Sequence, residues 1–121
     1  MTRAEFERLV EQAVAEIPDE FHRCLENVTI VVEDEPSAEV LESVGLDPRR
    51  DTLFGLYQGL PWSKRPHDYA GMPDHIAIYM GPLVRACGTR AQLERQVRAT
   101  VVHEIAHFFG LSEKRIRRLG Y

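Results

Sequence analysis

The chain has 121 residues, which is enough for one domain, and we expect a single domain over residues 1–121. Hydrophobic residues make up 44% of it and charged residues 28%, a composition typical of a folded globular chain and not of a disordered one. No apolar run approaches the ~18 residues that a membrane span needs, and charged residues interrupt the first nine positions, so no secretory signal is expected. The two cysteines, Cys24 and Cys87, are too few for a disulfide scaffold and do not form a CxxC motif. We therefore expect a cytoplasmic protein with reduced thiols and no membrane partner.

Charge is distributed unevenly around the net value of −4. Residues 1–51 hold 14 acidic against 5 basic side chains, whereas residues 52–121 hold 5 acidic against 10 basic ones. A basic half suggests nucleic-acid binding, but a chain of net negative charge lacks the usual electrostatic footprint. We interpret the imbalance as solvated helix faces and expect no nucleic-acid partner, although one basic cluster stands out: Lys114, Arg115, Arg117 and Arg118.

The first half of the chain begins with a helix signal. Thr2 followed by Glu5 is typical of a capping box at a helix start. Apolar residues then recur at helical spacing as far as Ile17, where Pro18 interrupts the pattern. Two further elements are expected in this half, a buried strand with β-branched residues and a short helix, at Val28–Val32 and Ala38–Ser43.

The second half predicts two strands and the longest helix. Its segments, in chain order, are a strand, a sixteen-residue loop, a strand, a long helix and a short helix: Thr52–Tyr57, Gly59–Asp74, His75–Met80, Arg90–Phe109 and Glu113–Leu119. Gly81-Pro82 is expected to close the second strand, and Thr89 followed by Gln92 predicts a capping box for the long helix. One small sheet with helices at both chain ends indicates an α+β fold.

The last two turns of the long helix are apolar on nearly every side but contain the sequence His103-Glu104-Ile-Ala-His107. A helix that is apolar all round is buried, so polar residues inside it need partners. Histidines four apart lie about 40° apart around the helix, so both imidazoles can reach one tetrahedral metal ion. Glu104 is rotated by about 100° from His103, beside the metal, where a base takes a proton from a metal-bound water. The alternative is two packed histidines and a surface glutamate.

Gly110 follows this motif and can turn the chain back toward the metal, because glycine adopts positive φ at little cost. Glu113 then becomes the candidate third ligand, since zinc accepts a carboxylate oxygen. The alternative is an acid in the first turn of a helix, stabilised by the helix dipole, and His67 or His75 would then be the next candidate ligands. A set of two histidines and a carboxylate also suits iron or nickel.

The stretch His103–Glu113, of the form HExxHxxGxxE, resembles the motif of the small bacterial minimal zincin family of metallopeptidases. Four other stretches resemble that family too: Asn27–Pro36, Gly55–Gly59, His75–Tyr79 with Gly81-Pro82, and Leu119–Tyr121. The resemblance implies a truncated zincin, in which a small twisted mixed sheet of about three strands packs on an active-site helix and an N-terminal helix. It implies one zinc ion held by His103, His107 and Glu113, with Glu104 as the general base.

The chain departs from the family pattern in two places. Members commonly have Asp where this chain has Glu113, which is longer by a methylene. No methionine follows His107, so the methionine turn of the wider group of gly-turn zincins is missing.

These motifs predict a zinc-dependent metallopeptidase that acts on a peptide or protein substrate. Zinc lowers the pKa of its water, and Glu104 accepts the proton and returns it to the leaving amine. The alternative is a non-catalytic zinc-binding interaction module on the same fold.

Zincins bind peptide as an extra strand, and Thr52–Tyr57 is the candidate sheet edge, because Gly55 and Gly59 let another backbone approach. These glycines are alternatively a bulge and a turn. Four further side chains are candidates to line a cleft or stabilise an oxyanion, or else are packing or surface residues: Tyr57, Trp62, His67 and Tyr69.

Overall fold

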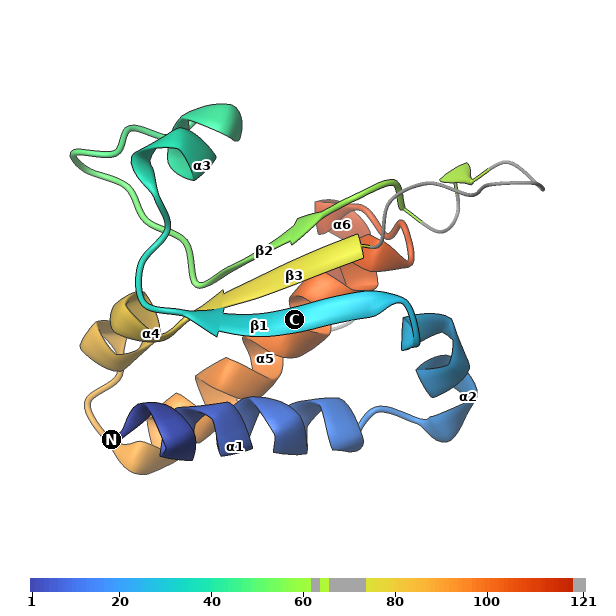
Figure 1. Cartoon of the computed structure of the whole chain (residues 1–121), viewed down its shortest axis with the longest axis horizontal. Coiled ribbons are helices and arrows are strands. Elements are labelled where there is room, and N and C mark those ends of the chain that lie inside the picture. The colour runs from blue at the N-terminus through green and yellow to red at the C-terminus, as the bar shows by residue number, and fades with distance from the viewer. Residues whose placement is uncertain (62–63, 66–73, 119–121) are drawn as a thin grey trace.

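The sheet is mixed in this computed structural model, which describes residues 1–61, 64–65 and 74–118. Its strand order is β1-β3-β2. Strand β1 (Val28–Glu33) runs parallel to β3 (Asp74–Tyr79), whereas β2 (Gly55–Gln58) pairs with β3 in the antiparallel direction. Among the described residues, β2 is therefore an edge strand (Figure 1).

Two long helices provide most of the core opposite the sheet. Helices α1 (Arg3–Ala15) and α5 (Arg90–Phe108) pack against each other, and α5 also contacts β2 and β3 (Figure 1). Their apolar side chains meet those of β3 in one cluster, whose fully buried members include Phe6, Ile76, Ile78, Val97 and Val101. The predicted α+β class, with a small mixed sheet on the motif helix and the N-terminal helix, is confirmed.

Side chains cap three helices where the sequence predicts a helix start, although the capping box predicted for Thr2 and Glu5 is only half formed. The Thr2 hydroxyl accepts a hydrogen bond from the backbone N–H of Glu5, and Thr89 and Gln92 form the reciprocal capping box of α5. Helix α3 (Ala38–Ser43) has the predicted bounds, with Ser37 as its cap. Between α1 and β1 lie a short helix α2 (Asp19–His22) and a 3-10 turn η1 (Arg23–Leu25).

The sequence-based interpretation of Gly81-Pro82 as the end of a strand is wrong. Strand β3 ends at Tyr79, and helix α4 (Met80–Ala86) follows it at once, with Pro82 in its first turn. Proline is tolerated there because the N–H groups of a first helical turn have no partner within the helix. Leu83 of α4 is completely buried, so this helix contributes to the core.

Strand β2 is shorter than the predicted Thr52–Tyr57, since its described bounds are Gly55–Gln58. Phe54 still accepts a hydrogen bond from the N–H of Tyr79, but the chain bends before it continues as a strand. Most of the predicted loop Gly59–Asp74 lies outside the described residues, as does Leu119, beyond the end of α6 (Glu113–Arg118). No described helix is long and apolar enough to cross a membrane. A single domain over residues 1–121 stays a prediction.

Candidate metal centre

The chain reverses at Gly110, which brings α6 back against the end of α5. Gly110 has φ of +88°, its N–H donates to the carbonyl of His107, and the N–H of Leu111 donates to the carbonyl of Ala106. This pair of bonds is the Schellman arrangement, which satisfies the last carbonyl groups of a helix. Ser112 caps the next helix by accepting from the N–H of Arg115, and Glu113 begins α6 beside the two histidines of α5.

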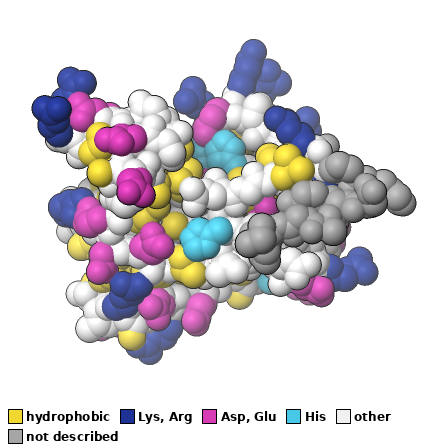
Figure 2. All heavy atoms as spheres, turned by 45° about the horizontal axis from the view of Figure 1, so that its top comes forward, with side chains coloured by type: hydrophobic (Ala, Val, Ile, Leu, Met, Phe, Trp, Pro, Cys, Tyr) yellow, Lys and Arg dark blue, Asp and Glu magenta, His cyan; other side chains and the backbone are white. Residues whose placement is uncertain are grey.

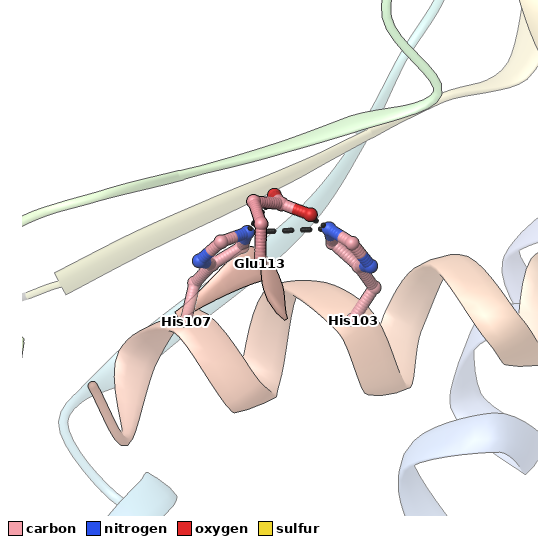
Figure 3. A group of neighbouring side chains, drawn as sticks. All are labelled: His103, His107 and Glu113. Atoms are coloured by element: carbon pink, nitrogen blue, oxygen red, sulfur yellow. Dashed lines mark hydrogen bonds and ion pairs between the residues drawn. The ribbon is translucent and has the colours of Figure 1, made fainter. Parts of the chain in front are cut away.

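Three donor atoms converge between these two helices (Figure 3). The Nε2 atoms of His103 and His107 are 3.2 Å apart, and Oε1 of Glu113 lies 3.0 Å from the first and 2.7 Å from the second. In a tetrahedral zinc site with bonds of about 2.0–2.1 Å, ligand atoms are about 3.3 Å apart. Two imidazole nitrogens and a carboxylate oxygen that face one point at these distances form a donor set that suits one divalent cation.

Both histidines reach solvent, which leaves an open side for a further ligand. Their side chains are 27% and 28% exposed, for His103 and His107. Figure 2 shows histidine side chains at the surface, with acidic side chains gathered to their left.

Burial raises the pKa of Glu113, but hydrogen bonds from His103 and His107 outweigh this effect, so its pKa is held below the ordinary value. The Glu113 carboxylate is therefore ionised at neutral pH, the form that binds a metal.

Glu104 lies beside the donors but is turned into the protein. It is only 7% exposed, and its Oε1 accepts a hydrogen bond of 2.9 Å from the backbone N–H of Tyr57 on β2. Burial raises the pKa of Glu104, and the two histidines and the Tyr57 N–H offset part of this rise. A hollow of about 310 Å³ is lined by Glu104 together with His103, His107 and Glu113.

Gly55 has a role that neither interpretation of the sequence anticipated. A Cβ atom at this position would lie 2.9 Å from Cγ2 of Thr100 and 3.2 Å from Cγ of Glu104. Gly55 thus allows helix α5 to approach the edge strand, so that Glu104 reaches the backbone of Tyr57.

The other candidates from the sequence do not join the donor group. Among the described residues that group contains His103, His107 and Glu113, and His75 of β3 is not part of it. Tyr57 lines the hollow, but its hydroxyl donates to Asp74 at 2.6 Å. His67, Trp62 and Tyr69 lie outside the described residues.

The hydrogen bond from the backbone N–H of Tyr57 to Glu104 was not expected from the sequence. No residue-type signal marks a backbone amide, and its acceptor Glu104 is 47 positions away in the chain.

The family model of the zincin-like metallopeptidases matches residues 25–121. The chain belongs to this family. The match covers the three strands, the motif helix α5 and Glu113, and it confirms the resemblance seen in the sequence. Among solved structures, a conserved hypothetical protein from Thermo thermophilus is similar, with 28% sequence identity and a TM-score of 0.58 over 88% of this chain and 92% of that chain. Among curated proteins, none matches the chain.

Proposed function

We propose that this chain is a zinc-dependent peptidase, with His103, His107 and Glu113 as the ligands of one zinc ion and Glu104 as the general base. The observation that carries the proposal is the position of Glu104. Its carboxylate lines the same hollow as the three donors and is tied to the edge strand by the Tyr57 N–H. A packed, non-functional glutamate has no reason to lie beside a set of metal donors on a buried helix turn.

Zinc, when bound, lowers the pKa of a water molecule and polarises the scissile carbonyl group. Glu104 accepts the proton of the attacking water. Burial raises the pKa of its carboxyl group, which makes the carboxylate a stronger proton acceptor than an exposed one. Since Oε1 is held by the Tyr57 N–H, we assign proton transfer to Oε2, which then returns the proton to the leaving amine.

The surface around Glu104 supports an extended peptide or protein as the substrate. A second hollow of about 470 Å³ adjoins the first, and the two share Leu53, Gly55, His103 and Glu104. Both therefore follow the segment that enters β2. The first contains the candidate metal centre, and the second extends from it along Gln96, Ala99 and Thr100 of α5. An extended chain along a sheet edge, with side chains in neighbouring hollows, is a common mode of peptide recognition.

The test combines elemental analysis with a peptide-library cleavage assay, with and without a chelator. The parent protein should carry one zinc per chain and cleave peptides, and Glu104→Gln should keep the zinc while hydrolysis falls by roughly 10²-fold or more. Glu94→Gln on the exposed part of the same helix is the matched control and should leave hydrolysis unchanged. Equal activity in Glu104→Gln and the parent would overturn the assignment. Stoichiometric zinc without any cleavage would instead favour the non-catalytic zinc-binding module.

We also propose that the protein works in the cytoplasm with reduced thiols. Cys24 and Cys87 are both free cysteines. A thiol titration of protein denatured directly from cells should find two thiols per chain, and one or none would contradict this part of the proposal.

A further inference from the structure

A second buried carboxylate lies on the sheet, away from the three metal donors. Asp74, the first residue of β3, is 2% exposed. Its Oδ1 accepts a hydrogen bond of 2.6 Å from the hydroxyl of Tyr57, and its Oδ2 pairs with the guanidinium of Arg65. A carboxylate that loses water needs such partners, because an unpaired buried charge is strongly destabilising.

This cluster is more than a salt bridge, because Tyr57 has two connections. Its side chain is bound to Asp74, and its backbone N–H is bound to Glu104. One residue of the edge strand therefore links the buried carboxylate at the start of β3 to the carboxylate at the candidate metal centre. Tertiary contacts fix both ends, since Asp74 is 17 positions and Glu104 47 positions from Tyr57 in the chain.

The aromatic ring of Tyr57 is held from a further side. It meets the ring of Phe108 edge to face, with 5.9 Å between the centroids, and the guanidinium of Arg65 lies 5.3 Å from the centre of the Phe108 ring. Burial, together with the hydrogen bond to Asp74, raises the pKa of Tyr57, so the phenol keeps its proton and remains a donor at neutral pH. A ring packed and bonded in this way leaves its residue little freedom to move along or away from α5.

Buried ion pairs contribute little net stability compared with apolar residues, and their best attested use is to specify one geometry. We propose that Asp74 and Arg65 are positioning residues: they hold the Tyr57 side chain so that its backbone N–H fixes the carboxylate of Glu104 at the metal centre. The catalytic importance of the Glu104 position rests on the proposed function. The positioning itself can be measured without bound metal and without peptide cleavage.

The experiment follows the backbone amide of position 57 in the metal-free protein, by the chemical shift of its proton and by its hydrogen exchange. Tyr57→Phe removes one hydroxyl and keeps the ring and the amide, and Asp74→Asn removes the charge that binds both partners. Each variant should speed exchange of this amide on the order of 10-fold relative to the amides of β3, and should move its proton resonance toward the value in Glu104→Gln. Glu16→Gln, which breaks the exposed pair of Glu16 with Arg98, is the matched control and should change neither quantity.

A merely structural role gives a different result. General destabilisation speeds exchange of the β3 amides by the same factor as that of position 57, and this outcome would overturn the inference. An unchanged position 57 amide in Tyr57→Phe would overturn the inference as well. Because Tyr57→Phe retains the Asp74–Arg65 pair, it still provides a test if Asp74→Asn fails to fold.

A second readout uses acetohydroxamate and the zinc-loaded protein, because this probe chelates zinc and shares its proton with an adjacent carboxylate. Tyr57→Phe should weaken its binding about 3- to 10-fold without changing zinc affinity, and the loss should vanish in the Glu104→Gln background. An equal loss in both backgrounds would contradict positioning through Glu104. If the chain cleaves no peptide but the position 57 amide responds as expected, the proposed function fails and the positioning role stands.

Discussion

Replacement of Gly55 by alanine tests how closely the edge strand and the motif helix approach each other. The added Cβ atom would lie 2.9 Å from Cγ2 of Thr100, 3.1 Å from the carbonyl oxygen of Ala77 and 3.2 Å from Cγ of Glu104. The carbonyl belongs to the central strand and cannot give way, so β2 must move outward. Overpacking of this kind costs about 1–3 kcal/mol, and the stiffer unfolded chain offsets about 0.4–1 kcal/mol, so we expect a net loss of about 1–2 kcal/mol.

Denaturant unfolding of metal-free protein measures this loss as a change in the free energy of unfolding. Gly88→Ala is the matched control, because a Cβ there meets only the flexible end of Gln92, at 3.3 Å, and we expect a change within about 0.5 kcal/mol. Adding Thr100→Ser to Gly55→Ala removes the nearest methyl group and should restore part of the stability. A Gly55→Ala variant as stable as the parent would refute the close approach on which this reasoning depends.

Three further predictions concern the metal ligand, the start of α5 and a surface pair. Glu113→Ala should weaken zinc binding at least about tenfold, and Glu113→Asp should restore much of the affinity, as measured by competition with a chelator. Equal zinc affinities of the parent and Glu113→Ala would show that Glu113 is not a ligand. Thr89→Ala should lower the free energy of unfolding by about 1 kcal/mol, because it removes the hydroxyl that caps α5. Thr89→Ser should lower it by less, because serine keeps this hydroxyl and loses only the methyl group. The hydrogen bond from Arg85 holds the pKa of Glu35 below its ordinary value. Glu35→Gln should therefore be less stable than the parent at neutral pH, and the difference should disappear in acid as the carboxylate is protonated; a pH-independent difference would contradict this.

The helices with polar caps were predictable because their signals are local. Thr2, Ser37 and Thr89 each bind an amide within three residues, so the sequence contains the whole interaction. The convergence of three side chains was predictable for the same reason, since helical periodicity relates His103 to His107 and one glycine turn brings back Glu113. Their role as metal ligands stays a prediction.

The features that the sequence did not predict depend on contacts between distant segments or on residues that suit more than one structure. A glycine followed by proline is as suitable for the first turn of α4 as for the end of a strand, and what favours the helix is the burial of Leu83. An acid next to a predicted strand is usually exposed, so nothing near Asp74 indicates that Tyr57 and Arg65 cover it.

The three candidate ligands lie within eleven consecutive residues, whereas the candidate base depends on the sheet. The ligand set needs only the end of α5, the Gly110 turn and the start of α6, so loop closure among the ligands costs little entropy. The carboxylate of Glu104 instead needs strand β2 at its side. Under the proposed function, metal binding and base orientation therefore depend on different contacts: the ligands on the turn between α5 and α6, and the base on strand β2. We therefore expect loss of the β2–β3 pairing to remove the contact that orients Glu104 before it separates the three candidate ligands, so that zinc content alone does not measure the proposed catalytic arrangement.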